Sequence, residues 1–332
     1  MRNTARFLAV AVAFAALLIS PAWADGFLET SEAGTLRVMS YNPYWDAIFP
    51  TGPHQYDKSA EFARVLRAVN PDIVCIQEVD PGRERLEVLA IFNRALPVQL
   101  GERWSIATGA DNVIVSRFPI SWSTGYVVDG RGVRARGHVL TIVDLPDGRG
   151  GTAVLVAGTH LTSGGTAANI RARSFQADSL VANIRAARES VAGATGLPVI
   201  IAGDLNTYAT DSRRHLETLL VGDISNEGRF GSDGSLDRAG IPMVDLLPAH
   251  NATGTDRWTW RDDTQAFEPY PLDRILYSGS SLVAVHSFVL NTSIMSAGEL
   301  EAAGLAVGDV ALELSSGDFD HLPLVVDLRY SP

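Results

Sequence analysis

Polar residues recur at the ends of apolar segments along this 332-residue sequence. Carboxylates, amides and histidines are costly beside apolar runs unless they are hydrogen-bonded or serve a function. The positions that end or flank such a run are Asn42, Glu78, His160, Asp204, Asn206, Asp273, Asp320 and His321. Because ligands of α/β sheets gather beyond the strand ends, we expect these side chains to form one polar pocket at a sheet edge.

The residue types in this set indicate metal-assisted chemistry. Carboxylate and amide oxygens suit Mg²⁺, Mn²⁺ or Ca²⁺. Cys75 is the only cysteine, which excludes an intramolecular disulfide and argues against a thiolate zinc site. His160 and His321 add the acid–base capacity that cleavage of a phosphate ester requires. The sequence therefore predicts metal-assisted hydrolysis of a phosphate ester.

The segments that must position these side chains alternate between strands and helices. For example, Phe62, Val65, Leu66 and Val69 recur at the spacing of one helical face. We predict helices over 56–69, 83–96, 167–188 and 212–220, and strands over 36–41, 73–76, 104–108, 112–116, 133–143, 152–159, 198–202, 258–260, 274–277, 282–290 and 322–328. This order lacks a strict β-α-β rhythm, so we expect an α/β fold of mixed sheets with helices outside.

The N-terminus has the pattern of an export signal. Arg2 and Arg6 precede an apolar stretch over residues 7–19, and a small-residue cleavage site ends at Ala24. The stretch is shorter than the roughly 20 residues that span a bilayer, which argues against an uncleaved anchor. We predict a signal peptide over residues 1–24, one domain over 25–332, a secreted or periplasmic location, and no stable membrane insertion after cleavage.

The charge balance limits the partners. The chain has 27 Lys and Arg residues against 38 Asp and Glu, a formal net charge of −11. Nonspecific binding of nucleic acids depends on Lys and Arg that neutralise phosphates, so a general attraction to polyanions is not expected. Either a cation bridges the phosphate or the substrate is small. We expect a monomer.

Six segments carry a more specific signal: VMSYN at 38–42, DIVCIQEV at 72–79, GTHL at 158–161, IAGDLN at 201–206, LDRIL at 272–276 and GDFDHLP at 317–323. In this order they resemble the successive motifs of the endonuclease/exonuclease/phosphatase family, in its deoxyribonuclease I-like form. The resemblance implies a four-layer α/β sandwich, with two packed mixed β-sheets flanked by helices.

The resemblance also implies a metal site and a phosphate contact. Glu78 would bind the divalent metal, with Asn42 and Asp320 lining the same site. Mg²⁺ is the expected ion, with Mn²⁺ or Ca²⁺ as alternatives. Asp204 would orient the attacking water, and Asn206 would contact the phosphate. Taken alone, Asp204 and Asn206 could equally shape a turn before the next helix.

The acid–base and basic residues complete the implied site. His321 would be the base or charge stabiliser paired with Asp273, because a carboxylate fixes the tautomer of its histidine and favours the imidazolium. His160 would donate to the phosphate or leaving group. Arg134 and Arg136 alternate in one predicted strand and so share a face, where they are candidates for substrate binding. A solvated sheet face is the alternative for both.

The predicted activity is that of a secreted, divalent-metal-dependent phosphodiesterase or nuclease, with a phosphate ester as substrate and DNA or RNA as candidates. A lipid or inositol phosphate esterase, of the sphingomyelinase or inositol-polyphosphate phosphatase kind, is an alternative with the same chemistry. An alternative of another class is a noncatalytic secreted binding protein on the same fold, against which the complete set of polar residues argues.

Overall fold

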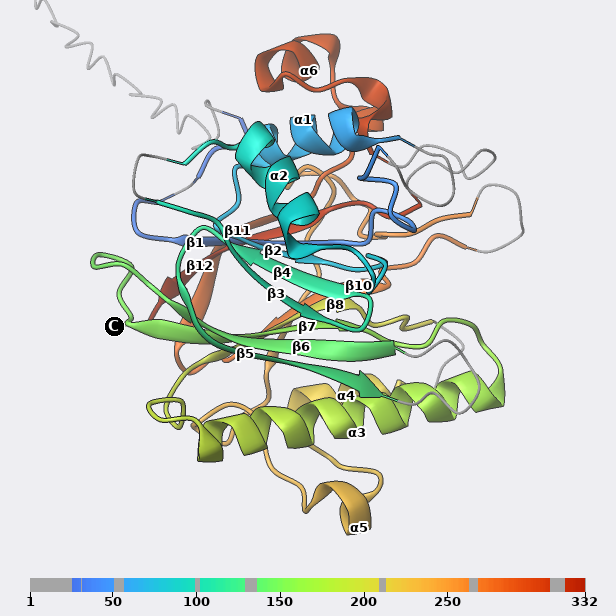
Figure 1. Cartoon of the computed structure of the whole chain (residues 1–332). Coiled ribbons are helices and arrows are strands. Elements are labelled where there is room, and N and C mark those ends of the chain that lie inside the picture. The colour runs from blue at the N-terminus through green and yellow to red at the C-terminus, as the bar shows by residue number, and fades with distance from the viewer. Residues whose placement is uncertain are drawn as a thin grey trace, which may run out of the picture.

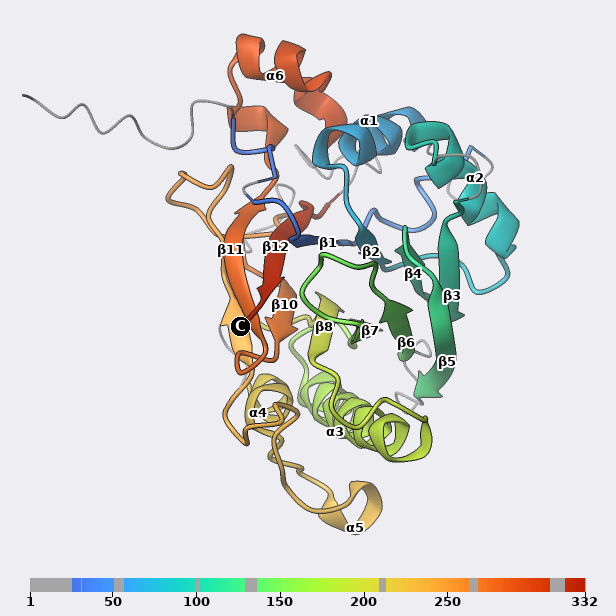
Figure 2. The same ribbon diagram turned by 90° about the vertical axis from the view of Figure 1, so that its left-hand side faces the viewer.

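The computed structural model describes residues 26–30, 32–50, 57–98, 102–128, 136–208, 213–262, 268–310 and 320–331. These residues form two six-stranded sheets that pack face to face, with helices on the outer face of each (Figures 1 and 2). The four-layer α/β sandwich expected from the sequence is therefore confirmed. Within the described ranges, no helix combines the length and the apolar character that a membrane crossing requires.

The first sheet has the strand order β11–β12–β1–β2–β4–β3. Its strands are β11 (Leu282–Val289), β12 (Leu324–Tyr330), β1 (Leu36–Tyr41), β2 (Ile73–Ile76), β4 (Asn112–Ser116) and β3 (Ser105–Gly109). β1 and β2 run parallel, whereas the other neighbours are antiparallel, so the sheet is mixed.

The second sheet has the order β5–β6–β7–β8–β10–β9. Its strands are β5 (Ile120–Val128), β6 (Arg136–Asp144), β7 (Ala153–His160), β8 (Val199–Asp204), β10 (Asp273–Tyr277) and β9 (Val244–Leu246). Here β7 and β8 form the parallel pair. The Gly-rich segment 145–151 joins the antiparallel strands β6 and β7, as its turn residues predict.

Helices cover the outer faces of both sheets (Figure 1). On the side of the first sheet lie α1 (Ser59–Val69), α2 (Arg85–Ala95) and α6 (Ala297–Ala303), and on the side of the second lie α3 (Ala167–Ser190), α4 (Arg214–Val221) and α5 (Glu227–Phe230). The 3₁₀ helices η1 (Thr292–Ile294) and η2 (Val307–Asp309) flank α6 in the chain. The predicted apolar face of α1 is its buried face, and Asn70 ends the helix in the left-handed conformation.

The core follows the alternation of side chains along the strands of the second sheet. Val139 and Val156 belong to the core cluster that reaches the first sheet. Leu140 and Leu155, their neighbours in sequence, pack in the second cluster with residues of α3. Successive side chains of a strand point to opposite faces. Both faces of β6 and β7 are therefore buried, which fixes their register.

Residues 258–260 do not form the predicted strand. Trp260 makes two isolated bridges instead, one to Tyr270 and one to His321. A strand needs a neighbour along its length, and Trp260 meets two different segments over one residue each. The prediction of a strand is therefore wrong here.

Candidate active site

The sheet register brings several strand ends to one edge of the sandwich. Asn42 and Glu78 follow the parallel strands β1 and β2, so both lie at the same edge of the first sheet. His160 and Asp204 end the parallel strands β7 and β8 and pair with each other. β10 runs antiparallel to β8, and its first residue, Asp273, pairs with Asp204. The strand pairing therefore gathers these residues into one group in each sheet, and the packing of the two sheets brings the groups together, with Asn42 in contact with Asp204.

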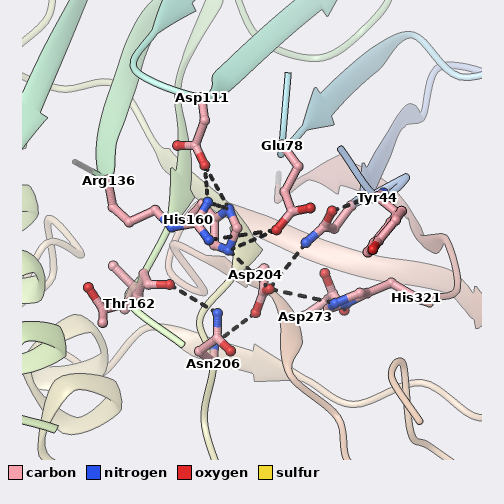
Figure 3. A network of polar contacts seen from close by, with 12 residues as sticks. Tyr44, Glu78, Asp111, Arg136, His160, Thr162, Asp204, Asn206, Asp273 and His321 are labelled. Carbon is pink, nitrogen blue, oxygen red and sulfur yellow. Dashed lines mark hydrogen bonds and ion pairs between the residues drawn. The ribbon is translucent and has the colours of Figure 1, made fainter. Parts of the chain in front are cut away.

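Asp320 and His321 reach the same edge from the opposite chain direction. They precede β12, which is antiparallel to β1 with Leu324 opposite Ser40, so the start of β12 lies beside the end of β1. Figure 3 shows His321 and Asp273 on one side of Asp204 and His160 on the other. The predicted polar residues thus converge from both sheets.

Asp204 is the centre of the cluster. Its Oδ2 accepts a hydrogen bond from Asn42 Nδ2 at 3.3 Å. The Nε2 atoms of His160 and His321 lie 3.4 Å and 3.7 Å from the same oxygen. Its Oδ1 accepts from the backbone N–H of Asn206 at 2.8 Å. Asp204 is 2% exposed, so these neighbours replace solvent around its carboxylate.

Each histidine beside Asp204 is oriented by a carboxylate of its own. His321 Nδ1 lies 2.6 Å from Asp273 Oδ2, and His160 Nδ1 lies 2.9 Å from Asp111 Oδ2. A carboxylate at Nδ1 fixes that nitrogen as the donor and directs Nε2 outward. The two His–Asp pairs therefore both present Nε2 to Asp204.

Asp111 is a site residue that the sequence analysis missed. It lies in the short turn between β3 and β4, where an Asp before Asn is ordinary turn chemistry. The only sequence signal is its place between two predicted strands, and this does not distinguish it from an ordinary turn residue. Burial alone would raise the pKa of Asp111, but His160 and Arg136 outweigh burial and lower that pKa below its usual value.

Arg136 belongs to the site and does not lie on a solvated sheet face. Its side chain is buried, and its Nη1 donates to Asp111. Nη1 also lies 2.7 Å from His160 Nδ1. Both of these nitrogens carry hydrogens, so they do not bond each other, and each donates to Asp111 Oδ2 instead. Its Nη2 lies 3.6 Å from Glu78 Oε1. Arg134, the other predicted basic residue, lies outside the described residues.

The position of Glu78 depends on an unusual backbone. Glu78 has φ 58°, and Tyr44, Trp45 and Asp46 have φ 55°, 32° and 57°. Non-glycine residues in this left-handed region are uncommon and gather at functional sites. The Trp45 N–H donates to Glu78 Oε2 at 3.0 Å, and the Asp46 N–H donates to the Glu78 carbonyl at 3.0 Å. The loop after β1 therefore holds both the backbone and the carboxylate of Glu78.

The electrostatics of the His321 side of the site favour positive charge. Burial alone would lower the pKa of His321, but Asp273, Asp320 and Asp204 outweigh it and raise that pKa well above its usual value. Burial, together with Glu78 and Asp204, raises the pKa of Asp320 to about 7 even though His321 opposes the shift. On this side of the site, the negative charge of Asp204, Asp273 and Asp320 therefore exceeds the positive charge of the His321 imidazolium.

The donor set fits a hard divalent cation in its chemistry. Asp320 Oδ1 is buried and has no hydrogen-bond partner among the described residues. A cation near Glu78 and Asp320 would satisfy this oxygen and relieve the repulsion between the two carboxylates. No group of three or more His, Cys, Asp or Glu side chains within the described ranges is arranged around one metal position. Any further ligands would have to be amide or water oxygens, and the amide oxygen of Asn42 is suited to this role.

His138, two residues after Arg136 on β6, gives the fold a pH dependence that is separate from the site chemistry. Burial lowers its pKa to about 4, and its Nδ1 lies 2.9 Å from Thr159 Oγ1. The unfolded chain has a histidine pKa of about 6.5, so it binds a proton first as the pH falls. We expect this group alone to lower the free energy of unfolding by about 3 kcal/mol between pH 6.5 and pH 4.

Urea unfolding of the wild type and of His138→Gln at pH 7, 5.5 and 4 measures this effect. The stability advantage of the wild type should shrink as the pH falls, because glutamine does not titrate. Parallel pH curves for the two proteins would contradict it.

The comparisons with known proteins agree with this geometry. The model of the endonuclease/exonuclease/phosphatase family matches residues 41–296. The chain belongs to this family. No curated protein sequence matches the chain significantly. The family assignment therefore rests on the family model, the fold and the motif residues together.

Solved structures of family members share the fold. The human Nocturnin catalytic domain with a bound sulfate anion is 18% identical, with 90% of this chain and 96% of that chain covered and a TM-score of 0.55. D. rerio TDP2 complexed with a single-strand DNA product is 16% identical, with 89% and 99% covered and a TM-score of 0.53. ANGEL2, a 2′,3′-cyclic phosphatase solved with adenosine-2′,3′-vanadate, is 14% identical, with 90% and 97% covered and a TM-score of 0.55.

Family membership supports a coarse statement of activity. Endonuclease/exonuclease/phosphatase members are hydrolases of phosphate esters, typically dependent on a divalent metal. The chain has the fold of such phosphoesterases and nucleases, and it brings together the polar residues that the sequence indicates.

Proposed function

We propose that the protein is a secreted, divalent-metal-dependent phosphodiesterase. One observation carries the proposal: two buried His–Asp pairs face the single carboxylate of Asp204, with Nε2 distances of 3.4 Å and 3.7 Å. A packing role does not need two oriented imidazoles and three carboxylates in one buried cluster, because burying charges is costly. Hydrolysis of a phosphate ester needs such a set of acid, base and charge-stabilising groups.

The proposed reaction uses Asp204 to orient and deprotonate the attacking water. The water oxygen forms a bond to phosphorus, its proton goes to Asp204, and the bond from phosphorus to the leaving oxygen breaks. His160, oriented by Asp111, acts as the general acid and donates its Nε2 proton to that oxygen. His321, held by Asp273, places positive charge beside the phosphoryl oxygens, where charge builds up in the transition state.

Arg136 and Asn206 would bind the phosphate. Arg136 supplies the permanent positive charge of the site, and its guanidinium already lies near Glu78 and Asp111. Asn206 supplies an amide N–H. Arg134, a candidate for the same role, stays a prediction from the sequence.

Glu78, Asn42 and Asp320 would hold the divalent metal, with Mg²⁺ as the expected ion and Mn²⁺ or Ca²⁺ as alternatives. When bound, such an ion neutralises charge on the phosphate. The unpartnered Asp320 Oδ1 and the raised pKa of its carboxyl group support this assignment. A metal would also let an acidic protein bind an anionic substrate.

Glu78→Gln tests the metal assignment. The amide keeps the shape of the side chain but removes its charge, so we expect the Mg²⁺ concentration for half-maximal activity to rise at least about 10-fold, within the range expected when a charged ligand is lost. Thermal unfolding without metal should change little, because relief of repulsion with Asp320 offsets the altered hydrogen bond from Trp45 and the lost ion pair with Arg136. A Mg²⁺ titration identical to that of the wild type would remove Glu78 from the metal site.

Nucleic acid is the proposed substrate class. The solved relatives TDP2, with a single-strand DNA product, and ANGEL2, with adenosine-2′,3′-vanadate, support a nucleotide-bearing phosphate ester. Lipid and inositol phosphates are the alternative within the same chemistry. Activity on plasmid DNA, RNA, sphingomyelin and phosphoinositides, measured side by side, distinguishes these classes.

We also propose export from the cytoplasm, on the basis of residues 1–24, which lie outside the described residues. The expected mature chain begins near Asp25 and acts as a monomer. The intact mass of the exported protein tests the cleavage, and a retained leader would contradict it.

A further inference from the structure

The Asn206 side chain has a defined orientation, set by partners at both of its polar atoms. Its Nδ2 donates to the Leu161 carbonyl at 3.0 Å, and its Oδ1 accepts from the Tyr208 hydroxyl at 3.0 Å. A carbonyl only accepts, so the amide nitrogen must face Leu161. The Gly164 N–H lies 3.4 Å from the Tyr208 oxygen and donates to it, which leaves the hydroxyl proton for Asn206. Both contacts therefore assign the same orientation.

The backbone of Asn206 is fixed as well. Asn206 has φ 49°, a left-handed conformation that Asn tolerates better than most residues, and its N–H donates to Asp204 Oδ1 at 2.8 Å. With the backbone and one Nδ2 hydrogen fixed, the second Nδ2 hydrogen has a defined direction. This second N–H can donate a hydrogen bond to a phosphate oxygen that lies beside Asp204.

We propose that Tyr208 is a positioning residue, which orients the Asn206 amide for contact with the phosphate. This inference rests on the proposed phosphodiesterase function and assigns a role to a residue outside the sequence motifs. Without the Tyr208 hydroxyl, the amide keeps its bond to Leu161 but can tilt about it. The second N–H then loses its alignment with the phosphate oxygens, and alignment is what a preorganised donor contributes to catalysis.

The α3 helix supports Tyr208 through Arg173 and Gln176. Arg173 is fully buried, and its Nη1 donates to the carbonyls of Thr162 and Gly164 at 2.7 Å and 2.8 Å. Its guanidinium lies 5.4 Å from the centre of the Tyr208 ring, within the range of a cation–π contact. Gln176 bonds the backbone N–H and the hydroxyl of Thr162 at 2.9 Å each. The loop that contacts Tyr208 is thus held by buried side chains.

Tyr208→Phe isolates the hydroxyl, because phenylalanine keeps the ring beneath Arg173. With plasmid DNA or bis(4-nitrophenyl) phosphate and Mg²⁺, we expect kcat to fall about 5- to 10-fold, the factor for loss of one neutral hydrogen bond that orients a donor. KM should change less than about twofold, since alignment matters most in the transition state. Tyr330→Phe is the matched control: its hydroxyl bonds Ala153 O, at the end of β12 away from His321, and its kcat should equal that of the wild type.

A double-mutant cycle with Asn206→Ala decides whether Tyr208 acts through Asn206. Asn206→Ala should lower kcat about 10²-fold, and adding Tyr208→Phe to it should change kcat less than about twofold. If Tyr208→Phe alone has the kcat of the wild type, or lowers kcat equally in both backgrounds, the inference is wrong. Should Asn206→Ala fail to fold, Asn206→Ser replaces it in the cycle. Inactivity of the wild type on every phosphodiester would instead refute the proposed function.

Discussion

Replacement of His321 by alanine should lower kcat at least about 10²-fold, the lower range for removal of one group that stabilises charge in the transition state. His321 is buried, lies 2.6 Å from Asp273 and faces Asp204, so its loss removes positive charge where the phosphoryl group would sit. KM should change far less. Steady-state kinetics on a cleavable phosphodiester measure both constants. His286→Ala serves as a control for loss of a buried histidine, because His286 bonds Phe27 O outside the site.

Asp273→Asn should be almost as damaging as His321→Ala. The amide can donate to the imidazole, which then adopts the wrong tautomer and loses the charge that favours its protonated form. Because the two residues act as a unit, the double variant should lose little beyond the worse single variant. Strictly additive losses in kcat, with all three variants folded, would show that the pair is not a functional unit.

Asp204→Asn should lower kcat about 10³-fold, the middle of the range for a general base. Asn has nearly the same shape, and its single amide oxygen can keep the hydrogen bond from the Asn206 backbone N–H, although not also the one from Asn42, which meets the other carboxylate oxygen. It cannot take a proton from water, and it removes the negative charge that lies between the two histidines. The variant should therefore fold and bind substrate while turnover is lost.

The control for this variant is Asp178→Asn, which replaces a buried aspartate whose oxygens accept from the backbone N–H groups of Ser225 and Asn226. It should change stability but not kcat. A kcat for Asp204→Asn within tenfold of the wild type would exclude Asp204 as the base.

The sequence predicted the sheets well where strands are buried on both faces. The apolar run 73–76 coincides with β2, and the 198–202 segment lies within the central part of the second sheet as β8. Continuous apolar character and Gly or Pro at the ends leave few alternatives for such segments. β5 was not predicted, although Ile120, Trp122 and Tyr126 favour a strand. Pro119 before it and Gly125 within it indicate a loop, and its side chains are half-buried and exposed in turn, so they form no continuous apolar run.

The candidate site could be predicted in part for a related reason. Residues at strand ends share an edge once the strands are parallel, so Asn42, Glu78, His160 and Asp204 follow from sequence order and topology. Asp111 could not be predicted this way, because it lies in a hairpin turn where Asp is ordinary. Its role depends on contacts with residues 25 and 49 positions away along the chain. Only the packing of the two sheets reveals such partners.

The central claim is metal-dependent hydrolysis of phosphodiester bonds, and one measurement tests it most directly. Purified protein is incubated with plasmid DNA and with bis(4-nitrophenyl) phosphate in excess EDTA, then with Mg²⁺ or Mn²⁺ restored, beside His321→Ala. We expect no turnover in EDTA, recovery with the metal, and at least about 10²-fold less turnover in the variant. Full turnover in EDTA would contradict the metal role, and no turnover of any phosphodiester with metal present would contradict the activity itself.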